Sequence, residues 1–167
     1  MAAILLCVDV QCGFVVDGVV EARMHELVRR AESGRYEQIW ASRFLNPGPG
    51  GPFHRWMQWY RFRPGDEEAE LWAPLARLDV RVFDKLSYGP PPSLLEAARA
   101  FEPGEIHMGG LDTEACVLAT AVGLFDAGAP PRVLTAACAS GKGPSAHEAG
   151  LAAIAGMLGP RSLINGA

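Results

Sequence analysis

The chain has 167 residues, of which 49% are apolar and 20% are charged, and its formal net charge is −4. This length and composition predict one globular domain over residues 1–167 and exclude a disordered chain. The acidic balance argues against a nucleic-acid-binding surface, and no apolar run is long enough to span a bilayer.

Short apolar runs alternate with segments of helical periodicity along the chain. Residues 4–8 form a nearly continuous apolar run, which is typical of a strand with both faces covered. Apolar residues then recur at helical spacing from Met24 to Ala31. Residues 38–42 predict a second strand, and the Pro- and Gly-rich stretch 46–52 is compatible with neither helix nor strand.

The second half of the chain continues the alternation. We expect the aromatic segment 53–62 to be a short helix or a lid near the sheet edge. Two later helices are predicted to begin with capping boxes at Ser93–Glu96 and Ser145–Glu148. The remaining predicted strands are residues 80–83, 105–108, 132–136 and 162–164. The pattern predicts an α/β fold with three layers: a mostly parallel, doubly wound, Rossmann-like sheet of about six strands with helices on both faces.

The segment Gly109–Cys116 carries the strongest functional signal. It joins a strand-like run to two glycines and an Ala-rich helical segment. With Thr113 as N-cap, Cys116 falls in the first helical turn, where free N–H groups and the helix dipole stabilise a thiolate. The same N–H groups can bind an oxyanion. On this segment alone, the alternative is a cysteine that fills the core as a small hydrophobe.

Two ionisable residues follow strands of the same predicted sheet. Asp9 comes directly after residues 4–8, and Lys85 follows residues 80–83. Because open parallel sheets bind ligands beyond the carboxyl ends of their strands, we expect Asp9, Lys85 and Cys116 at one edge. A carboxylate, a cation and a thiol together can form an activated nucleophile. Taken singly, Asp9 could be a cap and Lys85 a solvated lysine.

Three motifs, in this order, resemble those of the isochorismatase-like hydrolases, the family that includes isochorismatases, nicotinamidases and N-carbamoylsarcosine amidohydrolases. They are Val8–Phe14, Phe83–Ser87 and Gly110–Val117, and the similarity covers nearly the whole chain. The resemblance implies that Cys116 is the nucleophile and that Asp9 accepts and returns its proton. It also implies that Lys85 is the cation that completes the catalytic triad.

The resemblance carries further expectations about the site. It implies a cis peptide bond between Leu111 and Asp112 and an oxyanion hole formed by the backbone N–H groups of Asp112 and Cys116. Gln11 and Phe14, from the first motif, and Leu111 are expected to bind the substrate or shape its pocket.

Many members of this family hydrolyse amide-type C–N bonds through a thioester with the cysteine, whereas isochorismate-cleaving members act on a vinyl ether and do not need it. Cys116 therefore favours a hydrolase that cleaves an amide-type C–N bond of a small molecule without a cofactor. The alternatives are a hydrolase of an ester or enol ether, and a binding or scaffold protein that lost turnover. Many relatives pair near the active site, so a homo-oligomer is expected.

The chain departs from the family at one motif. Nicotinamidase-like members carry an Asp-x-His metal motif after the second strand, but the matching residues here are Phe44 and Asn46. These residues are not zinc ligands, and His54 alone does not make a site, so no metal is predicted. Substrate choice is assigned to residues 46–62. In this segment His54, Trp56 and Trp59 are candidate pocket residues. The alternative is that the two tryptophans belong to the core or to a dimer interface.

Cys7, Cys138 and His147 are interpreted as structural, whereas the role of Cys12 is left open because it lies close to Asp9 along the chain. Cys7 and Cys138 lie in or beside predicted strands, and His147 lies in the second predicted capping box. The four cysteines show neither disulfide-rich nor zinc-type spacing, and the first residues lack the basic lead and cleavage site of a signal peptide. Free thiols and a cytoplasmic location are therefore expected.

Overall fold

The computed structural model describes residues 2–101 and 104–165, which form one six-stranded sheet in the order β3-β2-β1-β4-β5-β6. Every neighbouring pair of strands is parallel. This confirms the predicted doubly wound, Rossmann-like sheet, in which the strand order reverses between the first and fourth strands. The strands are β1 (Ala3–Val8), β2 (Gln38–Phe44), β3 (Val80–Lys85), β4 (Glu105–Gly110), β5 (Arg132–Cys138) and β6 (Leu163–Ile164).

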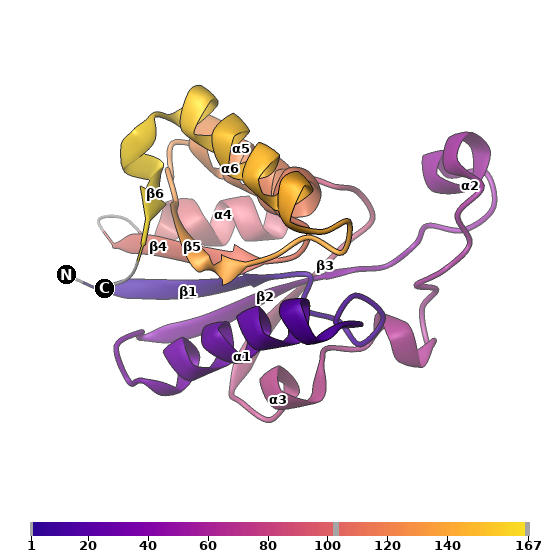
Figure 1. Ribbon diagram of the computed structural model, residues 1–167, viewed down its shortest axis with the longest axis horizontal. Coiled ribbons are helices and arrows are strands. Elements are labelled where there is room, and N and C mark those ends of the chain that lie inside the picture. The colour runs from indigo at the N-terminus through magenta and orange to yellow at the C-terminus, as the bar shows by residue number, and fades with distance from the viewer. Residues whose placement is uncertain (1, 102–103, 166–167) are drawn as a thin grey trace.

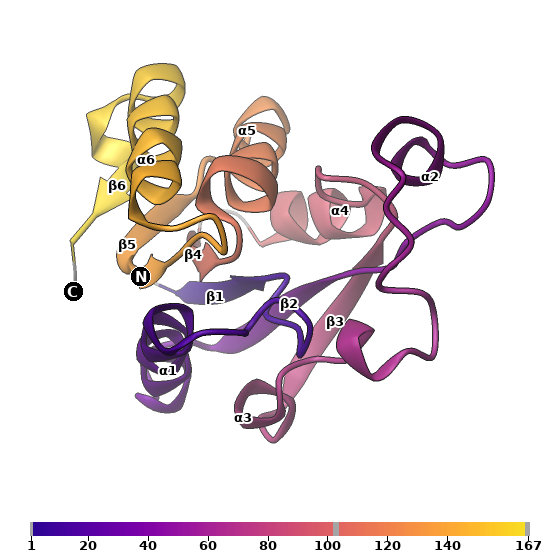
Figure 2. The ribbon, with the colours of Figure 1, turned by 45° about the vertical axis from the view of Figure 1, so that its right-hand side comes forward.

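Helices cover both faces of the sheet. They are α1 (Gly18–Glu32), α2 (Pro52–Met57), α3 (Ala73–Ala76), α4 (Pro92–Ala100), α5 (Leu118–Asp126) and α6 (Pro144–Leu158). Helices α1 and α3 lie on one face and α4, α5 and α6 on the other, whereas α2 projects from the body on an arm formed by residues 46–62 (Figures 1 and 2). No described helix is long and apolar enough to cross a membrane.

The hydrophobic core lies on both sides of the sheet because side chains alternate along each strand. In β1, Ile4, Leu6 and Val8 pack under α4, α5 and α6, whereas Leu5 and Cys7 pack toward α1. A third, smaller cluster connects the arm to the end of β2. Its buried members are Phe44, Phe53, Phe62 and Ala69.

Both predicted capping boxes are wrong. Helix α4 begins at Pro92 with Pro91 as N-cap, α6 begins at Pro144 with Gly143 as N-cap, and no side chain caps either helix. Proline suits the first helical position because it has no N–H group to leave unsatisfied. The proline before each serine therefore sets the helix start.

The end of β4 approaches β1 closely at Gly110. This residue has a φ of 136°, and a Cβ atom there would lie 2.1 Å from the carbonyl oxygen of Val8. Only glycine accepts both conditions. The N–H of Leu111 then donates to that same carbonyl at 2.9 Å. The segment after β4 is thereby held beside the end of β1, where Asp9 follows.

Candidate active site

A buried ion pair lies at the carboxyl ends of β1 and β3. Asp9 Oδ2 is 2.8 Å from Lys85 Nζ, and neither side chain is exposed. Because β2 lies between β1 and β3, the lysine side chain reaches across the end of β2. The ammonium also donates to the carbonyl oxygen of Tyr88 at 2.8 Å. Two charges removed from water need such partners, since an unpaired buried charge is costly.

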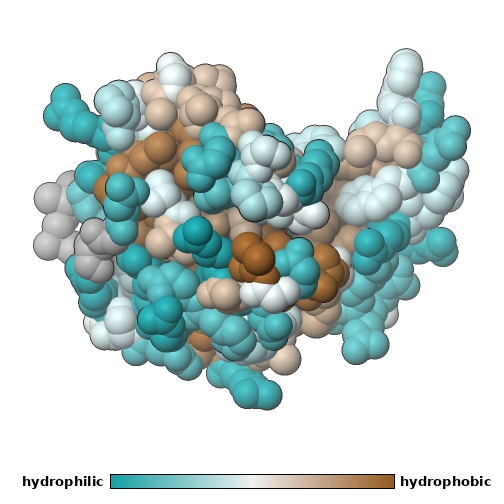
Figure 3. Space-filling model, viewed as in Figure 1, coloured by the Kyte–Doolittle hydropathy of each residue, from teal (hydrophilic) through white to brown (hydrophobic). Residues whose placement is uncertain are grey.

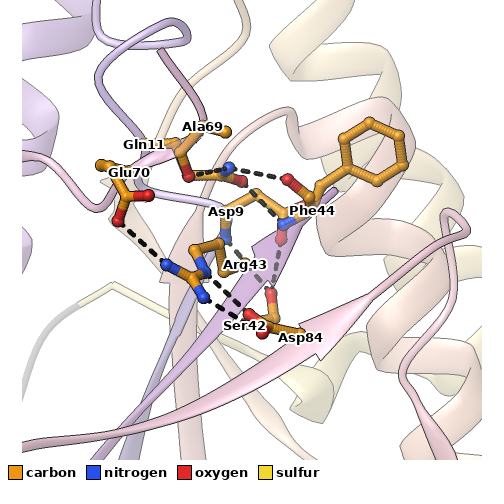
Figure 4. Close-up of polar contacts among 8 residues, drawn as sticks. All are labelled: Asp9, Gln11, Ser42, Arg43, Phe44, Ala69, Glu70 and Asp84. Carbon is orange, nitrogen blue, oxygen red and sulfur yellow. Dashed lines mark hydrogen bonds and ion pairs between the residues drawn. The ribbon is translucent and has the colours of Figure 1, made fainter. Parts of the chain in front are cut away.

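The end of β2 supports this pair through residues that alternate in direction (Figure 4). Ser42 Oγ donates to Asp9 Oδ1 at 2.6 Å. Arg43 donates to Asp84 at 2.7 Å and to Glu70 at 2.9 Å, away from the buried pair. Ser42 was not predicted as a site residue. The available signal was a hydroxyl at the end of an apolar strand that neighbours the strand before Asp9.

Cys116 lies on a π-helical turn, η2 (Thr113–Val117), between β4 and α5. The N-cap of this turn is Asp112, so the prediction of Thr113 as N-cap is wrong. Thr113 is buried, and its hydroxyl donates to the carbonyl oxygen of Ala139 at 3.0 Å. Cys116 is therefore the fourth residue of the turn and is only 8% exposed.

Burial raises the pKa of the Cys116 thiol well above its ordinary value. The charge of Asp9 raises this pKa further, while the charge of Lys85 lowers it. The resting thiol is therefore protonated at neutral pH, because desolvation outweighs the helix-terminus effect that would favour a thiolate. The thiol needs a base when it attacks, and Asp9 is the carboxylate whose charge acts on its pKa.

The backbone before Cys116 leaves the N–H group of Asp112 without an acceptor among the described residues. The peptide bond between Leu111 and Asp112 is cis. The N–H of Leu111 donates to Val8 and that of Thr113 to Ala139. Among the hydrogen bonds within residues 2–101 and 104–165, none uses the N–H of Asp112. A free N–H group near the thiol is the kind of donor that an oxyanion hole requires.

A cleft of about 250 Å³ lies between the arm and the body, with Cys116 in its wall. Figure 3 shows the surface hollowed between the body and the arm that carries α2. This volume is small for a ligand pocket and suits a small molecule. The lining residues are Asp112, Ala115, Cys116 and Lys142 from the body, together with Phe14, Phe44, Phe53, Met57, Trp59 and Tyr88.

Phe14 and Trp59, which were named from the sequence, line the cleft, whereas Gln11 and Leu111 do not. The side chain of Gln11 is buried. Its Nε2 donates to the carbonyl oxygens of Phe44 at 2.8 Å and Ala69 at 2.7 Å, and its Oε1 accepts from the N–H of Phe44 at 2.8 Å (Figure 4). Gln11 therefore connects the end of β2 to the short 3₁₀ helix Glu67–Ala69. Leu111 packs in the core on the α1 side.

Helix α2 turns only one of its faces toward the cleft. Phe53 and Met57, four residues apart, line it, whereas His54 and Trp56 lie outside the lining. Trp56 is 83% exposed, and the ring of His54 packs edge-on against Tyr60 at 4.7 Å. The four-residue spacing of Phe53 and Met57 could have indicated that they share the face toward the cleft. The high aromatic content of the segment drew attention to His54 and Trp56 instead.

The residues at the family's metal motif do not fit a metal ion. The Phe44 ring stacks on Trp59 with a centroid distance of 5.5 Å. Asn46 Nδ2 donates to the carbonyl oxygens of Trp59 and Arg61 at 3.0 Å each, and its Oδ1 accepts from the N–H of Gly48 at 3.1 Å. Within the described parts of the chain, no group of three His, Cys, Asp or Glu side chains could hold a metal.

The other three cysteines and the histidines lie outside the cleft lining. Burial raises the pKa values of Cys7 and Cys138 to about 12, and all four cysteines are free. His147 Nδ1 is 2.7 Å from the hydroxyl of Thr113, and burial lowers the pKa of this histidine. His147 thus packs α6 onto the turn that carries Cys116.

Comparison with protein-family models shows the family of this chain. Residues 3–162 match the model of the isochorismatase domain. The chain belongs to the isochorismatase family. Members of this family are hydrolases, and the match spans almost all of the described residues. A search of curated protein sequences finds no significant match.

Solved structures show the same isochorismatase-family fold. The nicotinamidase from Bacillus subtilis has a TM-score of 0.77 and 22% sequence identity, with 99% of this chain and 100% of that chain covered. The N-carbamoylsarcosine amidase from Thermoplasma acidophilum has a TM-score of 0.75 and 18% identity, with 99% and 100% covered. At these identities the likeness establishes the fold alone.

Proposed function

We propose that this protein is a cysteine hydrolase that cleaves an amide-type C–N bond of a small molecule. The observation that carries the proposal is the buried pair of Asp9 and Lys85, whose charges act on the pKa of the Cys116 thiol in the wall of a cleft of small-molecule size. The similar structures include proteins named as a nicotinamidase and an N-carbamoylsarcosine amidase, which supports an amide-type bond.

In the proposed reaction, Cys116 Sγ bonds to the substrate carbonyl carbon while Asp9 accepts the thiol proton. The N–H groups of Asp112 and Cys116 hold the developing oxyanion. Lys85 and Ser42 keep the carboxylate of Asp9 in place through the contacts described above.

Asp9 then gives its proton to the leaving nitrogen, the C–N bond breaks, and a thioester with Cys116 remains. A water molecule adds to the thioester carbonyl as Asp9 accepts one of its protons. The C–S bond then breaks, which releases a carboxylic acid, and the Cys116 thiolate takes the proton from Asp9. The net reaction consumes one water and yields an amine and an acid.

The proposal includes no cofactor and no metal, because Phe44 and Asn46 occupy the positions where metal ligands would stand. Amidase activity should therefore survive dialysis against a chelator. Loss of activity that zinc restores would contradict this part of the proposal.

The test is a panel of primary amides, N-carbamoyl compounds and ureides, with matching esters and an enol ether. We expect release of ammonia or amine, and a loss of at least about 1,000-fold in kcat for Cys116→Ala and Asp9→Asn. Intact-protein mass spectrometry should detect the acyl group on Cys116, and Cys12→Ala should keep its activity. Amide turnover in Cys116→Ala, or turnover of the enol ether alone, would refute the proposal.

A further inference from the structure

The cleft lining divides into an apolar wall and a charged edge. The wall combines Phe14, Phe44, Phe53, Trp59 and other apolar groups from both the body and the arm. Among the described lining residues, the charged side chains are Asp112 and Lys142.

The rings of the wall hold one another in place. Phe44 and Trp59 are nearly parallel, with an interplanar angle of 18° and centroids 5.5 Å apart. Phe53 meets the Phe44 ring edge-on at 4.9 Å, and Phe14 lies 6.4 Å from Trp59. Phe44 and Phe53 are almost fully buried. A slot of fixed aromatic rings binds a flat apolar group without the entropy cost of ordering the side chains.

The polar groups of Phe44, Asn46 and Tyr88 at this wall already make hydrogen bonds within the protein. Both backbone groups of Phe44 are bonded to Gln11, and the amide of Asn46 makes three hydrogen bonds to the backbone of the arm. The Tyr88 hydroxyl donates to Met57 Sδ at 3.4 Å. A polar atom pushed against the wall would therefore lose its water without gaining a hydrogen bond from these three residues, which costs affinity.

The charged edge does not offset this loss. The side chain of Lys142 is 73% exposed, and its Nζ lies 3.7 Å from Glu114 Oε1. This cation is solvated and already has a carboxylate partner, so it contributes little attraction for an anion deep in the cleft.

From this division of the lining we infer that the acyl group of the substrate is a flat, uncharged ring without polar ring atoms, as in a benzamide. The inference rests on the proposed function and narrows its substrate class. The ring lies against the wall, and the carbonyl carbon points toward Cys116.

The test compares benzamide with the three pyridinecarboxamide isomers, 4-carboxybenzamide and acetamide. All three isomers are used so that no orientation of the ring can hide its nitrogen in solvent. We expect kcat/KM for benzamide to exceed that of each other amide by about tenfold or more. Because a ring nitrogen also activates the carbonyl, binding is measured separately with Cys116→Ala by ligand-observed NMR, where the same order is expected.

Substitutions in the apolar wall test whether it is the part of the cleft that favours benzamide over acetamide. In the Cys116→Ala background, Trp59→Ala should weaken benzamide binding about tenfold and acetamide binding little, because a stacking face is lost. Met57→Ala should act in the same direction and does not endanger the fold, since Met57 is 54% exposed. As a control, Phe125→Ala removes an exposed aromatic ring outside the cleft and should change neither the affinity for benzamide nor that for acetamide.

The two proposals fail in different ways. Faster turnover of acetamide or 4-carboxybenzamide than of benzamide would overturn the inference and leave the amidase intact. If no amide is hydrolysed, the amidase proposal fails, and the binding series still decides the inference. Preferred binding of benzamide supports it, and equal or absent binding of the ring compounds overturns it.

Discussion

The carboxylate of Asp9 has two opposing effects on Cys116. It raises the pKa of the thiol through its charge, and it is the base to which the thiol proton is expected to pass. Removal of the charge by Asp9→Asn should therefore lower the thiol pKa and leave Lys85 to stabilise the thiolate. We expect faster alkylation of Cys116 by iodoacetamide at pH 8 in the variant than in the wild type, although amide turnover is lost. Peptide mass spectrometry over a pH series measures both rates.

The remaining cysteines provide internal references for this measurement. Cys7 and Cys138 are fully buried, so they should stay unmodified in both proteins. Cys12 is partly exposed and should react at the same rate in both. Slower alkylation of Cys116 in Asp9→Asn would mean that Asp9 already draws the proton from the resting thiol, contrary to the raised pKa.

The residues of the site differ in how far the sequence predicts them. The sequence predicts that Asp9, Lys85 and Cys116 lie at one edge of the sheet, because each follows an apolar run and parallel strands end at the same edge. Ser42 is not found, because its bond to Asp9 depends on which strands are neighbours. The protonated state of Cys116 is also missed, since burial comes from segments distant in the sequence, whereas the helix terminus is local.

Helix α6 holds the turn η2 in place through a contact with no spare room. A Cβ atom on Gly150 would lie 2.6 Å from the backbone nitrogen of Glu114. Gly150→Ala must therefore shift α6 or the turn that carries Cys116, and overpacking of this kind costs about 1–3 kcal/mol of unfolding free energy. We expect a lower melting temperature and a lower kcat on any amide that the wild type hydrolyses.

The same helix offers a matched control. A Cβ atom on Gly156 would meet nothing within 4 Å, so Gly156→Ala should stabilise the protein by about 0.4–1 kcal/mol and leave kcat unchanged. Equal melting temperatures of the two variants in thermal unfolding would show that the approach of α6 to the turn does not matter.

The strands are easier to predict than the ends and faces of the helices. Apolar runs fix the strands because both faces of a parallel sheet are covered. Ser93 and Ser145 suggest capping boxes, but Pro92 and Pro144 begin the helices. In α2, the composition of the segment does not show which aromatic residues face the cleft, because that depends on how the arm packs against Phe44.

At the scale of the whole molecule, the arm is the segment with the least core of its own. The hydrophobic cluster that connects it to β2 has four buried members, of which Phe53 and Phe62 belong to the arm, whereas the clusters on the two faces of the sheet are much larger. The arm nevertheless carries Trp56, which is 83% exposed, and Met57 and Tyr60, which are more than half exposed. Large apolar side chains gathered on one projecting segment are typical of a protein interface.

We therefore predict that the arm packs against a second copy of the chain and that Trp56 lies at that contact. Trp56→Glu should shift sedimentation velocity profiles toward the monomer, because a carboxylate would be buried without a partner at the interface. Phe125→Glu places the same charge on an exposed aromatic position of α5 and should leave the profile unchanged. A wild-type protein that sediments as a monomer at every concentration would refute the prediction, and a dimer that survives Trp56→Glu would place the contact elsewhere. Because Phe53 and Trp59 of the same arm line the cleft, loss of the dimer should also raise KM for ring-containing amides.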